Sequence, residues 1–158
     1  MLADVWNTYK FNWGLNNGGL YTAVKKEINL VWEFHHTFVY KKEEEGLYKS
    51  VSYVLLDVSS KWEGKYLLTM NVHLHSPLPF GNTEARRHQR NEIKEKLIQI
   101  QSDMTFPEGF EWSNCGVIFV GDMNIGYEDP EGNITEEYLE LSFFFSVFTF
   151  IDFFKKKS

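Results

Sequence analysis

Residues 117–124 read VIFVGDMN, and this stretch decides the fold class and points to a functional site. Its four consecutive apolar residues, 117–120, predict a buried strand. Gly121 ends the predicted strand, and Asp122 and Asn124 follow two positions apart. Because side chains alternate along an extended chain, the carboxylate and the amide lie on the same side. Strand ends are where α/β proteins commonly hold ligands, so the segment predicts a site, with a plain turn as the alternative.

A second group of polar residues lies upstream, where residues 71–75 read NVHLH. Asn71, His73 and His75 alternate along a predicted strand, so all three project from one face. Buried polar groups destabilise a protein unless they are paired, so this strand is expected to line a site or to reach solvent. The alternatives are a hydrogen-bonded core histidine for His73 and an exposed strand-end histidine for His75. A zinc site is not indicated, since no H-x-x-x-H spacing or cysteine pair accompanies them.

The composition is that of a globular protein, with 43% hydrophobic and 24% charged residues among 158. This length predicts one domain over residues 1–158. The net charge of −6 argues against binding that depends on neutralising many phosphates. A single cysteine, Cys115, excludes an internal disulfide framework. No signal-peptide pattern is found, which favours an intracellular location while leaving the compartment open.

The order of predicted elements indicates layers of helices on a mixed sheet. The residues of the longest apolar stretch, 141–154, are too few and too polar to form a membrane-spanning helix, although contact with a membrane surface stays open. The clearest helix covers 83–101, where Ile93, Leu97 and Ile100 form an apolar stripe expected to pack on the sheet. Hairpins followed by strand, helix, strand and helix predict an α/β architecture. Strands are expected at 20–24, 28–40, 50–58, 66–74 and 116–120, and a second helix from 134 to about 145.

The candidate ligands for a metal ion are rich in oxygen. Asp122 and Asn124, with Asn71 as a further candidate, offer a carboxylate and amide carbonyls, and histidine lies nearby. Oxygen donors with few nitrogens suit Mg²⁺, or Mn²⁺ in its place. The residues therefore predict a divalent-metal site with Asp122 and Asn124 as ligands.

Three segments in this order resemble the motifs of the endonuclease/exonuclease/phosphatase superfamily. They are NVHL at 71–74, RRHQ at 86–89 and VGDMNI at 120–125, where the superfamily usually has T/N-x-H-L, R-x-x-Q and G-D-x-N. The resemblance covers roughly residues 16–154. It implies part of a four-layer α/β/β/α sandwich of the DNase-I-like type, and metal-dependent phosphodiester hydrolysis.

Within the superfamily, two branches align with different histidines. The sphingomyelinase-like members are the best match, through HLHS at 73–76 and GDMNI at 121–125, followed by Glu128 and Asp129. That alignment makes His73 the site histidine. The pancreatic-type deoxyribonucleases have L-H-S-x-P, which can be aligned with LHSP at 74–77, one residue shorter, and selects His75 instead. The implied substrate is accordingly a phospholipid head group, with sphingomyelin first, or a nucleic acid as the alternative.

The resemblance also assigns roles to individual residues. Asp122 is expected to orient and activate the attacking water, Asn124 to fix that geometry, and His73 to donate to a phosphoryl oxygen. Two expected parts, a Gln-Glu motif that carries a metal-binding Glu and a late Asp-His pair, are not found in the sequence. We therefore expect a truncated domain, with a non-catalytic remnant as a third hypothesis. The residues expected to contact substrate are Asn71, His75 and Arg86.

Overall fold

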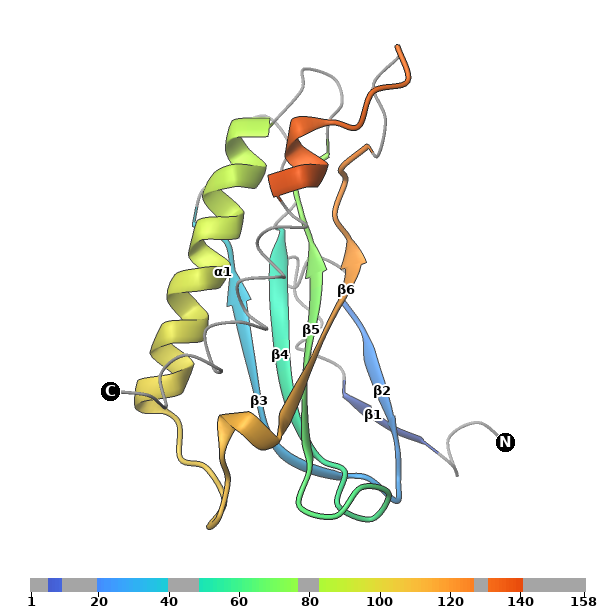
Figure 1. Ribbon diagram of the computed structural model, residues 1–158, viewed down its shortest axis with the longest axis vertical. Helices are drawn as coiled ribbons and strands as arrows, with labels where there is room; N and C mark the ends of the chain where they lie inside the picture. The colour runs from blue at the N-terminus through green and yellow to red at the C-terminus, as the bar shows by residue number, and fades with distance from the viewer. Residues whose placement is uncertain (1–5, 10–19, 40–48, 77–82, 127–130, 141–158) are drawn as a thin grey trace. The chain divides into compact units, whose positions relative to one another are not determined.

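The computed structural model describes residues 6–9, 20–39, 49–76, 83–126 and 131–140 (Figure 1). The chain forms two compact units, Met1–Met123 and Asn124–Ser158, and each is described by itself. The prediction of one domain over 1–158 is not tested by this division and stays a prediction. The apolar stretch 141–154 lies outside the described residues, as do Glu128 and Asp129.

In its described residues the first unit is built on a four-stranded mixed sheet, which confirms the predicted α/β class. The strand order is β3-β4-β5-β6. Strand β3 pairs antiparallel with β4, and β4 pairs antiparallel with β5, whereas β6 runs parallel to β5 after the crossover through α1. A parallel pair needs such a long connection, whereas antiparallel strands are joined by short turns. The bounds are Asn29–Thr37 for β3, Ser50–Asp57 for β4, Tyr66–His73 for β5, Cys115–Asp122 for β6 and Thr83–Asp103 for α1.

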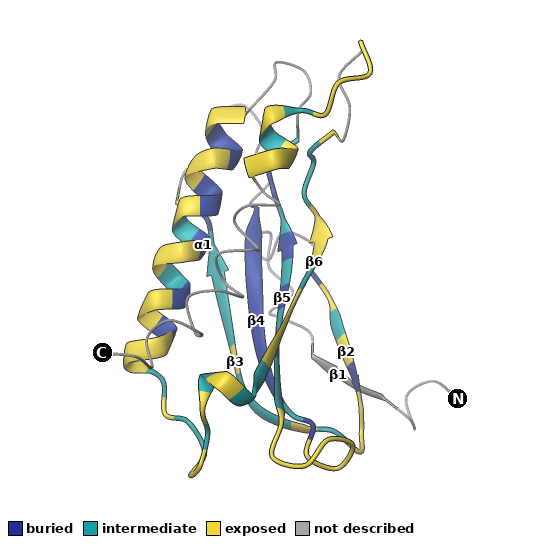
Figure 2. Cartoon of the chain, in the orientation of Figure 1, coloured by how far each residue is buried: buried dark blue, intermediate teal, exposed yellow. Residues whose placement is uncertain are grey.

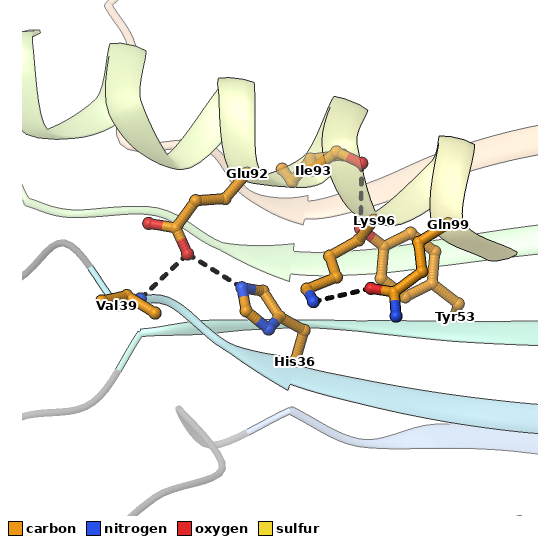
Figure 3. A network of polar contacts seen from close by, with 7 residues as sticks. All are labelled: His36, Val39, Tyr53, Glu92, Ile93, Lys96 and Gln99. Carbon is orange, nitrogen blue, oxygen red and sulfur yellow. Dashed lines mark hydrogen bonds and ion pairs between the residues drawn. The ribbon is translucent and has the colours of Figure 1, made fainter.

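Helix α1 packs on one face of this sheet through the stripe that the sequence predicts. Ile93, Leu97 and Ile100 are all buried, and the opposite side of the helix is exposed (Figure 2). The hydroxyl of Tyr53 on β4 donates to the carbonyl of Ile93 at 3.3 Å (Figure 3). The core between helix and sheet contains fully buried side chains of β4 and β5, among them Val51, Tyr53, Leu55, Leu68, Met70 and Val72.

The other face of the sheet is partly covered by a two-stranded antiparallel sheet. It consists of β1 (Trp6–Tyr9) and β2 (Thr22–Lys25). Val24 of β2 forms a buried cluster with Val54, Leu56 and Val58. Strand β1 was not predicted, because a four-residue strand is too short to show an alternation of apolar and polar residues.

Strand β6 contradicts the prediction of a buried central strand. Val117, Ile118 and Val120 are 45%, 44% and 46% exposed. In the described part of the sheet, β6 is an edge strand with β5 as its neighbour, and α1 lies beside β3 and β4 (Figure 1). A run of apolar residues indicates that a strand is suited to burial. Whether the strand is in fact buried depends on which other elements cover it. The strand also continues through Gly121 to Asp122, so Gly121 does not end it.

The connection from α1 to β6 folds through aromatic contacts. Phe106 stacks on Phe110 with ring centroids 4.5 Å apart, and Trp112 packs edge-on against both. Trp112 opens the short helix η1 (Trp112–Asn114), which leads directly into β6. In the second unit the described helical residues are 136–140, so this helix begins two residues later than predicted. No described helix is long and apolar enough to cross a membrane.

Candidate functional site

Three polar residues form a row across the sheet at the ends of its strands. Strand pairing places His73 opposite Ser50 on one side and opposite Asp122 on the other. Tyr53, which contacts α1, pairs with Met70, so the alternate positions Asn71 and His73 face away from the helix. The fold therefore brings His73 and Asp122 together on the sheet face opposite α1.

The contact between His73 and Asp122 is the centre of the candidate site. The Nε2 of His73 lies 3.7 Å from the Oδ2 of Asp122, and their side chains are 30% and 63% exposed. The backbone carbonyl of Asp122 accepts a hydrogen bond from the N–H of Leu74 at 2.9 Å, so the parallel pairing extends to the end of both strands. A carboxylate and an imidazole thus meet where solvent or a substrate can reach them.

Lys49 is a member of this site that the sequence analysis missed. Its Nζ lies 2.7 Å from the Nε2 of His73, and the residue is only 9% exposed. Lys49 directly precedes β4, and its carbonyl accepts a hydrogen bond from the N–H of Phe38 at 3.0 Å. The pairing of Ser50 with His73 explains the contact, because it brings the start of β4 to the end of β5. The sequence shows only that Lys49 lies next to a predicted strand. Its partner cannot be identified without the pairing register of that strand with β5.

Asn71 links the two sheets. Its Nδ2 donates to the carbonyl of Tyr21 at 3.0 Å and lies 3.5 Å from the Oγ1 of Thr22. The amide therefore holds the beginning of β2 against β5, one alternate position away from His73. Contact of Asn71 with a substrate stays a prediction.

His75 lies in a different environment from His73. It is buried, its backbone N–H donates to the Oε1 of Gln89 at 2.9 Å, and its carbonyl accepts from the Nη1 of Arg86 at 3.2 Å. The R-x-x-Q motif is therefore a clamp on the backbone just after the strand that carries His73. Arg86 is itself buried and also contacts the Oγ1 of Thr83 at 3.3 Å, so the structure gives the motif a positioning role. The predicted substrate contacts of Arg86 and His75 stay predictions.

Gly121 has a steric reason to be glycine. Its φ is +125°, and a Cβ at this position would lie 1.9 Å from the carbonyl oxygen of Val72. A side chain would therefore push β6 away from β5 immediately before Asp122. The glycine of the G-D-x-N segment thus permits the close approach of the two strands that carry the site.

Asn124 belongs to the second unit, so its predicted role beside Asp122 stays a prediction. Its φ of +52° lies in the left-handed region, which asparagine adopts more readily than most other residues. The donor chemistry of Asp122 suits a hard cation, because Mg²⁺ is commonly bound by one or two carboxylates together with water and substrate oxygens. The described residues contain no cluster of three or more His, Cys, Asp or Glu that could hold a metal ion by itself.

The fold is that of a part of the DNase-I-like α/β proteins. A crystal structure of tyrosyl-DNA phosphodiesterase 2 (TDP2) from Caenorhabditis elegans shares 19% sequence identity with a TM-score of 0.51 over 85% of this chain. A truncated form of that protein gives 18% identity and the same TM-score. The chain spans 36% of the first structure and 46% of the second. No protein-family model and no curated protein matches the chain.

Proposed function

We propose that this chain is part of a divalent-metal-dependent phosphodiesterase of the endonuclease/exonuclease/phosphatase superfamily. The observation that carries the proposal is the convergence of His73 and Asp122, 3.7 Å apart, at paired strand ends of a DNase-I-like sheet. The three sequence motifs in their order support it independently. Within the described residues, NVHL contributes His73 to the contact with Asp122, and RRHQ holds the backbone of His75. The glycine of VGDMNI permits the close approach of β6 to β5.

The substrate we propose is a phosphodiester in a nucleic acid. The neighbours in the structural comparison are TDP2 proteins, which by name act on tyrosyl-DNA phosphodiesters. This likeness favours the nuclease-type hypothesis over the sphingomyelinase-like one, which has no support among these structures. A nucleic-acid substrate is compatible with the net charge of −6, since a local site can bind one phosphate without a basic surface.

In the proposed mechanism, Asp122 activates the water molecule that attacks phosphorus. Its exposed carboxylate can accept a proton from a water molecule and orient it towards phosphorus. A Mg²⁺ ion bound by Asp122 would neutralise charge on the phosphoryl oxygens. An N–H donor of the protein beside Asp122 would bind those oxygens, and one such hydrogen bond in a transition state is worth about 3 kcal/mol.

The test compares substrates and a matched pair of variants. The purified chain is incubated with Mg²⁺ and a 5′-phosphotyrosyl oligonucleotide, bis(p-nitrophenyl) phosphate or sphingomyelin. We expect Mg²⁺-dependent hydrolysis of the first two, reduced at least about 100-fold by Asp122→Asn. Asp103→Asn, at the exposed end of α1, is the control and is expected to retain activity.

Three outcomes would contradict parts of this proposal. Hydrolysis of sphingomyelin alone would restore the sphingomyelinase-like hypothesis. Full activity of Asp122→Asn would remove Asp122 from the mechanism. A folded chain that hydrolyses none of the three substrates would favour the non-catalytic remnant.

A further inference from the structure

A groove lies beside the candidate site, on the sheet face opposite α1. It has a volume of about 510 Å³ and is lined by residues of β2, β5 and β6, together with Ile28 and Leu56. Most of its lining is apolar, with Val24, Ile118 and Val120 among the side chains. Ile118 and Val120 are 44% and 46% exposed, so a ligand can contact them. This size and an apolar lining with few polar groups are typical of a small-molecule site.

The groove is continuous with the row that contains Asp122. Strand pairing places Val120 opposite Asn71, and both residues line the groove. The next pair on the same face is Asp122 opposite His73, two positions further along each strand. Two positions correspond to about 7 Å along a strand. A substrate whose phosphate lies at Asp122 therefore has the groove within reach of the group next to that phosphate.

The groove also offers polar and aromatic contacts to a ligand. The Nδ2 of Asn71 donates to the carbonyl of Tyr21, whereas its Oδ1 has no donor among the described residues. An amide oxygen accepts hydrogen bonds, and the exocyclic amines of adenine and cytosine donate them. Tyr21 itself lines the groove and is 50% exposed, and an accessible tyrosine ring can stack on a nucleobase.

We propose that this groove binds the nucleobase next to the scissile phosphate of a single-stranded nucleic acid. The proposal rests on the phosphodiesterase function and the nucleic-acid substrate proposed above, and it names how that substrate is held. The flat faces of a base match the apolar side chains of the groove, and its polar edge matches the amide of Asn71. A base within a duplex is stacked and paired, so only an unpaired base can enter.

The charge of the chain favours a nucleobase over the phosphate backbone as the main source of affinity. A net charge of −6 is unfavourable for binding that depends on many phosphate contacts. A nucleobase is uncharged, and the burial of its faces against apolar side chains does not require a basic surface. The acyl chain of a phospholipid would also fit apolar walls, but it has no donor for the Oδ1 of Asn71. The nucleobase is therefore the occupant that uses both kinds of contact.

The first test is binding, which does not require activity. 2′-Deoxyadenosine 5′-monophosphate is added to the full 158-residue chain, and the methyl signals of isoleucine are followed in ¹H–¹³C spectra. The signal of Ile118 is identified by its loss in Ile118→Val. We expect this signal to shift to saturation, because a nearby aromatic ring changes the local magnetic field, while that of the exposed Ile98 on α1 stays in place. An unchanged Ile118 signal would overturn the proposal.

Further probes test the chemistry of the ligand. Inorganic phosphate lacks the base and should leave Ile118 unchanged; an equal shift with phosphate would overturn the proposal. Purine 2′-deoxyriboside 5′-monophosphate lacks only the amine, and we expect it to bind at least about threefold more weakly than the adenine nucleotide. Equal affinities would refute the contact with Asn71. A shift with dihexanoyl phosphatidylcholine and none with the nucleotide would identify a lipid site instead.

A matched pair of variants tests the groove itself. Ile118→Asn places an amide among its apolar side chains, and we expect nucleotide binding to weaken at least about tenfold. Val117→Asn is the control, because Val117 is 45% exposed and projects from the other face of β6. Isothermal titration calorimetry measures the affinities once circular dichroism has shown that both variants are folded. Equal affinities of the two folded variants would overturn the proposal.

Hydrolysis separates this proposal from the proposed function. The substrates are the p-nitrophenyl ester of 2′-deoxyadenosine 5′-monophosphate and methyl p-nitrophenyl phosphate, which has no base. With Mg²⁺, Ile118→Asn is expected to lower kcat/KM at least about tenfold for the first and less than about twofold for the second. Nucleotide binding by a chain that hydrolyses neither would support the groove while refuting the phosphodiesterase function. Equal losses on both substrates would refute the groove and leave the phosphodiesterase function standing.

Discussion

The side chain of Gln89 on α1 accepts a hydrogen bond of 2.9 Å from the backbone N–H of His75, and both residues are buried. Arg86, one turn earlier on the helix, binds the carbonyl of the same residue. The helix therefore fixes both backbone polar groups of the second residue after His73. Helix α1 thus holds the backbone two residues after His73, the residue that contacts Asp122.

Gln89→Leu is predicted to destabilise the protein by about 1–3 kcal/mol, because it leaves the buried N–H of His75 without that acceptor. Leucine keeps nearly the same volume, so the loss reports the hydrogen bond more than the packing. Gln101→Leu, on the exposed side of the same helix, is expected to change stability by less than about 0.5 kcal/mol. Urea unfolding followed by circular dichroism measures both variants. Equal effects would show that the clamp adds no stability.

Gly121→Ala is predicted to cost about 3 kcal/mol or more. The substitution combines a φ of +125° with a Cβ placed 1.9 Å from the carbonyl oxygen of Val72. Gly116→Ala on the same strand is the matched control, since its Cβ would meet only the Cδ1 of Leu67 at 3.4 Å and the carbonyl oxygen of Tyr66 at 3.9 Å. The control is expected to lie within about 1 kcal/mol of wild type. A Gly121→Ala protein as stable as Gly116→Ala would refute the close approach of β5 and β6.

Tyr53 is predicted to make stability fall at alkaline pH. Burial, assisted by the negative charge of Glu92, raises the pKa of the Tyr53 hydroxyl far above its ordinary value. A pKa raised by folding gives stability that is fully present below the unfolded value, about 10, and is lost as the pH rises beyond it. The expected slope from this residue approaches about 1.4 kcal/mol per pH unit.

Tyr53→Phe removes that contribution, so its stability should fall less steeply above pH ~10 than that of the wild type. At neutral pH the variant is expected to lose about 1 kcal/mol with the hydrogen bond to Ile93. Chemical unfolding at a series of pH values measures the slope, with Tyr21→Phe on an exposed tyrosine as the control. Identical alkaline slopes for wild type and Tyr53→Phe would contradict the assignment.

Local patterns in the sequence were sufficient for the elements that carry most of the core. The helical spacing of Ile93, Leu97 and Ile100 predicted the buried face of α1, and β-rich runs located the four strands of the main sheet. The alternation of Asn71 and His73 correctly placed them on one face of β5. These features depend on the spacing of residues that are close in the sequence, so they can be predicted from the sequence alone.

Features that depend on pairing between distant segments were not predicted. The exposure of β6 depends on its place at the edge of the described sheet, and its apolar residues are equally typical of a covered strand. The contact of Lys49 with His73 depends on the register between β4 and β5, which places Ser50 opposite His73. Register follows from the hairpin that joins the strands, and a shift of one residue would turn His73 to the other face.

The last prediction concerns Glu92, which ties the end of β3 to helix α1 (Figure 3). One oxygen, Oε2, lies 2.8 Å from the Nε2 of His36 and accepts from the N–H of Val39 at 2.9 Å. The side chains of His36 and Glu92 are only 13% and 16% exposed, so water screens their contact little. Glu92→Gln is predicted to cost about 1–3 kcal/mol, because a neutral amide is a weaker acceptor for both donors.

A double-mutant cycle isolates the contribution of the pair. The coupling free energy from His36→Ala, Glu92→Ala and the double variant is expected to be about 0.5–3 kcal/mol, and Glu95→Ala on the exposed side of α1 should stay within about 0.5 kcal/mol of wild type. Because Glu92 also accepts from the backbone of Val39, Glu92→Ala should cost more than His36→Ala. Additive effects of the two substitutions would show that His36 and Glu92 do not interact in solution, since residues in direct contact are coupled.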